Sequence, residues 1–179
     1  MRAGPGIICL TASFLVAVPA AAGPRGWSRA SDRGRNALVI AALGAPAVQG
    51  DWHGDVEAAE SLLAAGGVTY ALKELVRERR PDGSDNRSFP SGHTSISFAA
   101  AATLEKRYGW TFGAPAFAVA TLVGAGRVAA DKHYVHDVLA GATIGATAGW
   151  LLTSRHDERV RWLPWAAHGG GGMTLSARW

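Results

Sequence analysis

The sequence contains one cysteine, Cys9, and this scarcity restricts the chemistry that is open to the protein. Cys9 lies in an N-terminal segment in which a basic start is followed by an apolar run over Ile7–Val18 and then by small residues. This order is typical of a secretory signal and predicts cleavage after Ala22, with an uncleaved anchor helix over residues 1–22 as the alternative. The cleaved chain has no thiol, so disulfides and thiolate metal sites are excluded and an oxidising compartment poses no hazard.

Charged residues are also few, at 18% of the chain, and the formal net charge is +4. Much of the basic excess lies in four arginines that follow the N-terminal segment, namely Arg25, Arg29, Arg33 and Arg35. No nucleic-acid readout motif accompanies these charges, so we expect no nucleic-acid partner. The charge pattern favours an arm that faces solvent or lipid head groups.

The apolar runs are shorter than the about 20 residues that a bilayer-spanning helix needs, and the mean hydropathy is only +0.06. Five runs with helix-compatible composition follow the N-terminal segment: Ala37–Val48, Ala58–Leu75, Thr94–Leu104, Phe112–Gly126 and Val138–Leu152. The β-branched and aromatic alternation of strands is mostly absent from them. The sequence therefore predicts an all-α bundle of about five helices, which either cross a membrane or form a buried core.

Changes in composition mark the two ends of the predicted helical domain. We place this domain at residues 23–160, between the signal segment and a tail at residues 161–179. The tail has a four-glycine turn at Gly169–Gly172, followed by an alternation of apolar and polar residues, and this pattern predicts a β-hairpin. Within the domain, glycines such as Gly141 and Gly145 allow neighbouring helices to approach closely.

Three short polar stretches stand out from this apolar background. They are Lys73-x6-Arg80-Pro81, Pro90-Ser91-Gly92-His93 and Arg127-x5-His133-x3-Asp137. Together they supply three cationic side chains, two histidines and one aspartate. An enzyme needs such a set to hold a tetrahedral oxyanion and to attack it.

The first stretch places Lys73, Arg77 and Arg80 at positions i, i+4 and i+7, which share one face of a helix. Pro81 ends that helix, because the residue before a proline avoids the α region. A cationic stripe at a helix end can hold a dianionic phosphate. The alternative is a solvated face whose charges pair with neighbouring glutamates.

The other two stretches combine a helix start with two histidines. Ser91 suits an N-cap, and Gly92 lets a ligand approach the first backbone N–H groups of the helix. His133 and Asp137 share a helix face, and a carboxylate on one ring nitrogen raises the basicity of the other. These features make His133 the candidate nucleophile and His93 the candidate general acid.

The order and spacing of the three stretches resemble the type 2 phosphatidic acid phosphatase (PAP2) superfamily, which includes bacterial class A acid phosphatases and vanadium haloperoxidases. The resemblance covers residues from about 70 to about 150. It implies that His133, His93 and Asp137 are catalytic, and that the phosphate is bound by Lys73, Arg80, Ser91, Gly92 and Arg127. The third motif of the superfamily starts Ser-Arg, whereas this chain has Gly126-Arg127, so a hydroxyl hydrogen bond is lost but no catalytic group is missing.

The resemblance also implies an activity and a location. We expect a phosphatase without a cofactor, acting on a phosphomonoester or a diphosphate, with a lipid phosphate favoured. Six apolar segments, counting the N-terminal one, match the layout of the membrane enzymes of the superfamily, so we expect membrane association and a site that faces the periplasm. The alternatives are a vanadate-dependent haloperoxidase and a non-catalytic scaffold with the same fold.

A metal site is a further alternative, because His136 stands between His133 and Asp137 in a ligand-like spacing. Zinc sites in proteins use three or four side chains. No further cluster of histidine or cysteine supplies the remaining ligands, so we predict no metal site.

Overall fold

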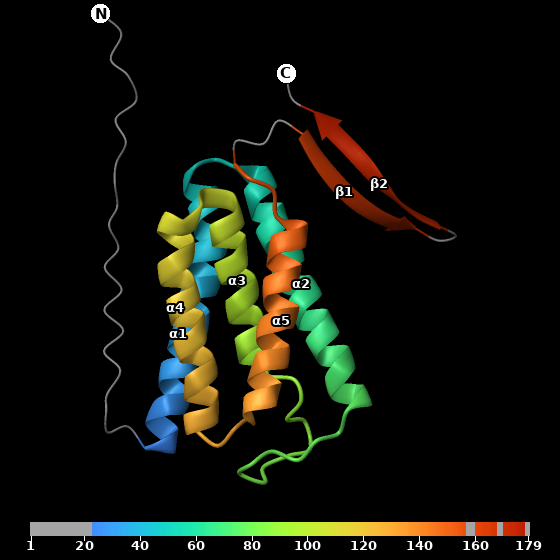
Figure 1. The fold of residues 1–179 in the computed structure, drawn as a ribbon. Helices are drawn as coiled ribbons and strands as arrows, with labels where there is room; N and C mark the ends of the chain where they lie inside the picture. The colour runs from blue at the N-terminus through green and yellow to red at the C-terminus, as the bar shows by residue number, and fades with distance from the viewer. Residues whose placement is uncertain (1–22, 157–159, 168–169, 178–179) are drawn as a thin grey trace, which may run out of the picture.

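The computed structural model describes residues 23–156, 160–167 and 170–177, so the predicted signal segment at 1–22 lies outside the described residues. The described chain contains five helices: α1 (Pro24–Val48), α2 (Trp52–Leu75), α3 (Gly92–Tyr108), α4 (Trp110–Ala129) and α5 (Val135–Leu152). They lie side by side in one bundle (Figure 1). The predicted all-α bundle is confirmed, and each of the five apolar runs lies inside one helix.

The C-terminal tail contains two paired strands. β1 (Val160–Ala167) runs antiparallel to β2 (Gly170–Ala177), with Val160 opposite Ala177 and Ala167 opposite Gly170. The strands follow the end of α5 and belong to no larger sheet among the described residues. The bundle itself is therefore built from helices alone.

The central helix of the bundle is α3, which packs against each of the other four helices. Its middle consists of alanines, and residues 99–102 are all buried. Because alanine adds little width, four neighbours can pack closely around this helix. The apolar core beside it includes Leu38 and Ala42 of α1 and Ala120 of α4.

Glycines on α5 bring this helix against α3 at very short distance. A side chain at Gly141, Gly145 or Gly149 would overlap the backbone of α3. A methyl group at Gly141, for example, would lie 2.5 Å from the Ser91 carbonyl oxygen. The predicted close approach at Gly141 and Gly145 is confirmed, and it fixes the start of α5 against the start of α3.

The first helix begins earlier than the apolar pattern predicts, at Pro24, and it includes the four arginines assigned to an arm. The four arginines therefore form no separate arm, although Arg25, Arg29 and Arg33 are exposed, as the charge pattern predicts. Proline at the first position favours a helix start, and the buried residues Ser31, Gly34 and Leu38 continue the inner face of the helix ahead of the apolar run. As a result Arg35 is half-buried in the bundle.

The second helix ends two residues after Lys73, so the predicted helical stripe through Arg77 and Arg80 is wrong. The chain instead runs as a loop over residues 76–91, in which the Arg80 backbone N–H donates to the Asp85 carbonyl. A continued helix would place like charges on one face, where they repel each other. The loop separates them and allows Arg80 to point in a direction of its own.

The opposite end of the bundle is held by a buried ion-pair network. Arg107, near the end of α3, is 3% exposed and donates to Glu57 at 2.7 Å and to Asp51. It also donates to the Ser154 carbonyl at 3.3 Å. These contacts tie α2 and α3 to the segment that follows α5, at the end of the bundle that carries none of the candidate site residues.

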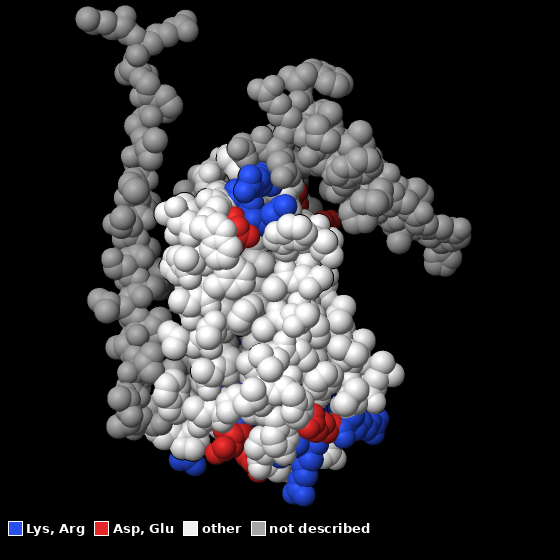
Figure 2. All heavy atoms as spheres, viewed as in Figure 1, with Lys and Arg blue, Asp and Glu red and all other residues white. Residues whose placement is uncertain are grey.

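The surface of the bundle is divided between charged ends and an uncharged middle. In Figure 2 the charged side chains of the described residues gather at the two ends of this face, and the band between them is uncharged. Large apolar side chains are exposed along the helices, among them Ile40, Leu63, Val68, Leu122 and Leu139. Within the described chain, α4 is the helix whose length and composition would allow it to cross a membrane.

Candidate active site

The three polar stretches meet at one end of the bundle. The loop at 76–91 leads from α2 to α3, and the turn at 130–134 leads from α4 to α5. Both connections lie at the same end of the bundle (Figure 1). The last turns of α2 and α4 therefore lie beside the first turns of α3 and α5, and these turns and the two connections carry the candidate site residues.

His133 is buried at this end, with 2% of its surface exposed, and its two ring nitrogens face different partners. Nδ1 lies 3.3 Å from Asp137 Oδ2, and Nε2 lies 3.3 Å from the Arg80 guanidinium. A carboxylate only accepts and a guanidinium only donates, so the proton belongs on Nδ1 and the lone pair on Nε2. Burial and the positive charges of Arg80 and Lys73 lower the pKa of His133 to about 3, so the ring is neutral at physiological pH.

Asp137 is fixed by donors from two segments of the chain. Its Oδ2 accepts from the Ser88 hydroxyl at 2.5 Å and from the Tyr134 backbone N–H at 2.9 Å. Its carbonyl oxygen accepts from the Ser91 N–H at 3.0 Å. These contacts orient the carboxylate toward His133. The sequence analysis missed Ser88, because a serine in a polar loop carries no signal of such a role.

Arg80 and Lys73 reach the site from the end of α2 and the loop after it. Arg80 is oriented by Asp85, whose Oδ1 accepts from its Nε at 2.7 Å. The Lys73 ammonium donates to the carbonyls of Arg87 and Ser88 at 2.6 and 3.1 Å. Burial and the Arg80 charge lower the pKa of Lys73 to about 8. Lys73 is therefore still mostly protonated at neutral pH.

Arg127 in the last turn of α4 adds a second guanidinium, and it is only 6% exposed. One of its terminal nitrogens donates to the Ser28 hydroxyl at 3.3 Å and lies 3.9 Å from Asp32 Oδ1. Its Nε is buried and donates to no acceptor among the described residues. An unsatisfied buried donor is costly, and an anion bound in the site would accept from it.

The start of α3 provides backbone donors. Ser91 is the N-cap of this helix, as predicted, but its hydroxyl accepts from Thr94 Oγ1 at 2.9 Å and does not cap a backbone N–H. The N–H groups of Gly92 and His93 have no acceptor within the helix, because they belong to its first turn. The protein leaves space beside Gly92, since a methyl group there would make only an ordinary contact of 3.6 Å with Thr69.

The first helix contributes two residues that the sequence analysis did not assign to the site. Nε2 of His93 lies 2.6 Å from Asp32 Oδ1 and 3.0 Å from the Arg35 guanidinium. One ring nitrogen cannot donate to Asp32 and accept from Arg35 at the same time, so the two contacts belong to different protonation states. Burial and the charges of Arg127 and Arg35 lower the pKa of His93 to about 4, while Asp32 acts in the opposite direction.

Gly126 has a packing role that explains its departure from the Ser-Arg pattern. A side chain at this position would overlap the Ser31 hydroxyl of α1. Ser31 is buried, and its hydroxyl lies 3.0 Å from the Trp27 carbonyl, which accepts a hydrogen bond from it. The glycine thus lets α1 pack tightly against the end of α4, close to Arg127.

Comparison with known proteins assigns the chain to a family. The sequence profile of the PAP2 superfamily matches residues 56–161, which include all three polar stretches. The chain belongs to the PAP2 superfamily. The three polar stretches at the loop 76–91, the turn 130–134 and the adjoining helix ends are thus part of the matched region.

Two relatives of this PAP2 protein are lipid A phosphatases. It is 33% identical over 124 residues to the lipid A 4'-phosphatase of Helicobacter pylori, over 63% of this chain and 62% of that protein. It is 35% identical over 100 residues to the lipid A 1-phosphatase of Porphyromonas gingivalis, over 54% of this chain but only 22% of that protein. The chain thus spans less than two thirds of the length of either relative. A decaprenylphosphoryl-5-phosphoribose phosphatase of Mycobacterium tuberculosis is 29% identical over 76% of this chain and 81% of that protein.

Solved structures have the same fold. The crystal structure of Aquifex aeolicus LpxE superposes with a TM-score of 0.62 at 22% identity, over 72% of this chain and 84% of that one. A transmembrane PAP2 type phosphatidylglycerolphosphate phosphatase from Bacillus subtilis superposes with a TM-score of 0.51 at 25% identity, over 72% of each chain. The helical bundle of this protein is therefore a PAP2 fold.

Proposed function

We propose that this PAP2 protein is a metal-independent phosphatase that hydrolyses a lipid phosphomonoester or diphosphate through a phosphohistidine intermediate. The observation that carries the proposal is the environment of His133, whose Nδ1 faces Asp137 and whose Nε2 faces Arg80. A phosphate that takes over the Arg80 hydrogen bond would lie against the lone pair of Nε2. The relatives named as phosphatases of lipid A and of decaprenylphosphoryl-5-phosphoribose support the class of substrate.

The first step would transfer the phosphoryl group from the substrate to His133. The Nε2 lone pair forms a bond to phosphorus while the bond between phosphorus and the leaving oxygen breaks. His93 donates a proton to that oxygen, so the product leaves as an alcohol or, from a diphosphate, as a monophosphate. Arg80, Arg127 and Lys73 stabilise the negative charge on the other phosphate oxygens. Asp137 stabilises the positive charge that develops on the ring of His133.

The second step would release inorganic phosphate. Water attacks phosphorus, the bond between phosphorus and His133 Nε2 breaks, and the proton of the water passes to His93. The low pKa of His93 in the empty site, about 4, suits it to accept this proton. A bound phosphate offsets the charges of Arg127 and Arg35, so it raises the pKa of His93 and favours the acid form that the first step needs.

The surface beside His93 supports a lipid as the leaving group. A hollow of about 430 Å³ begins at Arg35, which contacts His93, and is otherwise lined mainly by apolar side chains, Val39, Ile40 and Ile96. An acyl or prenyl chain could lie there while its phosphate occupies the site. Ile40 is largely exposed at this hollow, so a lipid chain could reach it from the apolar part of a membrane.

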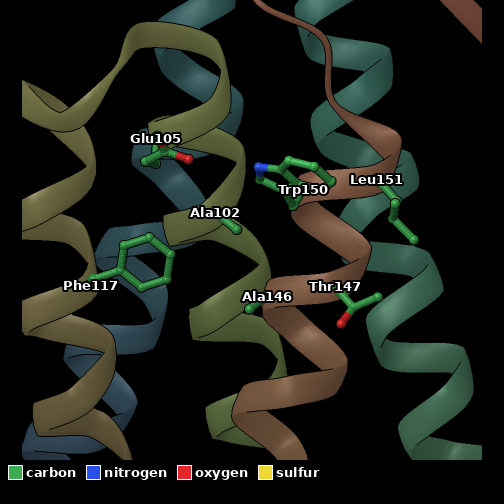
Figure 3. Close-up of a pocket in the computed structure, with 7 residues that line it drawn as sticks. All are labelled: Ala102, Glu105, Phe117, Ala146, Thr147, Trp150 and Leu151. Carbon is green, nitrogen blue, oxygen red and sulfur yellow. The ribbon is translucent and has the colours of Figure 1, made fainter.

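A second hollow, of about 330 Å³, lies between α3, α4 and α5 (Figure 3). Its walls include Ala102, Phe117 and Trp150. Ala102 and Trp150 belong to the later halves of helices that start at the site, so this hollow lies toward the opposite end of the bundle. No described lysine or arginine lines it to hold a phosphate, and the acidic Glu105 would repel one, so we assign it no part in the reaction.

The experiment that tests the activity compares substrates in the presence of EDTA. The substrates are phosphatidate, polyprenyl diphosphate, phosphatidylglycerol phosphate, lipid A, a nucleotide and p-nitrophenyl phosphate. We expect turnover of at least one lipid substrate with inhibition by vanadate. Activity that needs added Mg²⁺ would contradict metal independence, and a clear preference for nucleotides would contradict a lipid substrate. Halide oxidation that requires vanadate and peroxide would instead indicate a haloperoxidase.

We further propose that the protein associates with the membrane of the cell envelope and that its site faces the periplasm. The supporting observations are the signal-like N-terminal segment and the uncharged band between the charged ends of the bundle. Ser84, in the exposed loop beside the site, offers a test. In a Cys9→Ser background, Ser84→Cys should react with an impermeant maleimide in intact cells whose outer membrane is permeabilised. Labelling only after lysis would place the site on the cytoplasmic side.

A further inference from the structure

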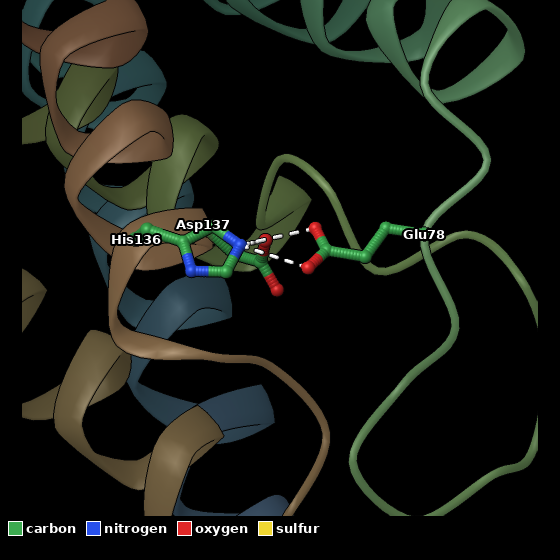
Figure 4. Close-up of side chains that lie close together, drawn as sticks. All are labelled: Glu78, His136 and Asp137. Carbon is green, nitrogen blue, oxygen red and sulfur yellow. Dashed lines mark hydrogen bonds and ion pairs between the residues drawn. The ribbon is translucent and has the colours of Figure 1, made fainter.

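A cluster of charged side chains beside Asp137 takes no part in the proposed reaction. Glu78 of the loop approaches His136 and Asp137 of α5 (Figure 4). Nε2 of His136 lies 3.0 Å from each carboxylate oxygen of Glu78 and 3.2 Å from Asp137 Oδ1. A ring nitrogen carries at most one proton, so it cannot satisfy three carboxylate oxygens at once.

The two oxygens of Asp137 are used very unequally. Oδ2 accepts from Ser88 and from the Tyr134 N–H, and it faces His133. Oδ1 is buried and accepts no hydrogen bond from the described residues. It lies 3.2 Å from Nε2 of His136, the nitrogen that also faces Glu78 (Figure 4). His136 is near, but the hydrogen bonds of its Nε2 go to Glu78. A buried carboxylate oxygen without a hydrogen bond is costly, and a cation would satisfy it.

The ring of His136 is held in position by aromatic neighbours. It stacks on Tyr134 with ring centres 5.4 Å apart and an interplanar angle of 9°, and on Phe89 at 6.1 Å and 30°. The side chains of His136 and Glu78 are 57% and 30% exposed. An ion could therefore enter from solvent and meet a ring that is already oriented.

We propose that Glu78, His136 and Asp137 bind a divalent transition-metal ion, of which Zn²⁺ suits them best, and that bound Zn²⁺ inhibits the enzyme. One ligand atom from each residue lies within 4.8 Å of the others, so small movements would bring all three onto one ion. Zinc accepts imidazole nitrogen and carboxylate oxygen, and a water can take the fourth position. Two carboxylates neutralise its charge.

Neighbouring cations limit the affinity. Lys73 and Arg80 carry positive charge at the same end of the bundle, and Lys73 is close enough to Asp137 for the carboxylate to influence its pKa. These charges oppose a second cation. We therefore expect a Kd for Zn²⁺ in the micromolar range. Such an affinity suits a reversible inhibitor better than a permanent structural ion.

The inhibition rests on the proposed function, whereas the binding does not. Zn²⁺ on Oδ1 would withdraw negative charge from Asp137, whose Oδ2 faces Nδ1 of His133. The ring would become less basic, and Nε2 would attack phosphorus more slowly. The ion would act through Asp137 and need not touch the substrate.

The test measures Zn²⁺ binding to the full chain, purified with a tag that contains no histidine and stripped of metal with EDTA. In competition with a chromophoric chelator we expect one Zn²⁺ per chain, with binding at least about tenfold weaker in Glu78→Gln and in His136→Ala. His53→Ala removes an exposed histidine outside the cluster and should bind Zn²⁺ like the unmodified chain. Absent binding in the unmodified chain, or unchanged binding in both cluster variants, would reduce Glu78 and His136 to an ion pair and overturn the site.

The same proteins test the inhibition. At the concentration that fills the site, Zn²⁺ should slow phosphate-ester hydrolysis by the unmodified chain and by His53→Ala. Inhibition of Glu78→Gln should need a Zn²⁺ concentration at least about tenfold higher. Binding without inhibition would overturn the coupling to His133. The binding assay requires no turnover, so a chain that binds Zn²⁺ here but hydrolyses no phosphate ester would overturn the proposed function and leave the site standing.

Discussion

Asp32 of α1 lies 2.6 Å from Nε2 of His93, so the first helix places a carboxylate on the candidate general acid. Each of the two histidines thus has a carboxylate partner, since Asp137 faces His133. The partners differ in effect. Asp137 contacts Nδ1 of His133, so the lone pair is on Nε2, which faces Arg80. Asp32 instead contacts the same nitrogen of His93 that Arg35 contacts. Asp32 therefore favours the protonated form of His93, and Arg35 favours the neutral form.

The first prediction is that Asp32→Asn slows poor leaving groups more than good ones. Loss of the carboxylate lowers the pKa of His93 further, so His93 loses its proton at a lower pH than in the unmodified chain. Because an alkyl leaving group needs that proton, kcat for an alkyl phosphate should begin to fall at a lower pH as well. We expect a loss of about tenfold at neutral pH for the alkyl ester, and little change for p-nitrophenyl phosphate, whose leaving group needs little protonation. The measurement is the pH profile of kcat for both esters, with Glu60→Gln on the exposed face of α2 as the control. Equal losses on both esters with an unmoved profile would leave Asp32 a purely structural role.

The second prediction concerns the phosphohistidine. His133→Ala should lose several orders of magnitude in kcat, as is typical of a missing nucleophile. Asp137→Asn should lose a large part of the activity, because the ring of His133 is no longer oriented by a charged partner. The check is phosphoryl trapping by rapid acid-free quench with labelled substrate, alongside circular dichroism to establish that the variants fold. Near-normal turnover in a folded His133→Ala protein would exclude the mechanism.

The third prediction follows from the pKa of Lys73, which is lowered to about 8. Lys73 is charged below that pH and neutral above it, so its attraction for phosphate is present at neutral pH and disappears as the pH rises through about 8. We expect KM to rise above this pH in the unmodified chain. Lys73→Arg should keep a charge throughout and give a flatter KM, whereas Lys73→Met should raise KM by about tenfold at neutral pH. A KM that rises in the same way in Lys73→Arg would assign the titration to another group.

The fourth prediction tests the packing of α5 on α3. Gly145→Ala should destabilise the protein by about 1–3 kcal/mol, because the added methyl group overlaps the Ser95 carbonyl of α3. Gly67→Ala on α2 is the matched control, since a methyl group there meets nothing within 4 Å. It should be neutral or stabilise by up to about 1 kcal/mol through helix propensity. Thermal unfolding followed by circular dichroism checks both, and equal stability of the two variants would refute the close approach.

The sequence by itself was sufficient for the helical fold and for the family. Runs of apolar residues about three to five turns long, separated by polar or Gly/Pro links, predict helices because burial of one face is their main source of stability. The spacing also predicted that His133 and Asp137 face each other, and the contact exists, although α5 begins only at Val135 and His133 lies in the turn before it. The phosphate-binding roles came from the resemblance to the superfamily and not from spacing.

Only the tertiary structure decided where the cations point and which other residues join them. The sequence predicted a helix through Arg80, but the chain turns into a loop there, because hydrogen bonds such as that between Arg80 and Asp85 replace the helical ones. Arg35 looked like a member of a basic arm and Asp32 carried no signal, since nothing in a local pattern shows that α1 packs against the start of α3. Glu78 contacts His136, which is also far from it in the sequence. Contacts between distant segments depend on how whole helices pack, and that information is absent from spacing within any one segment.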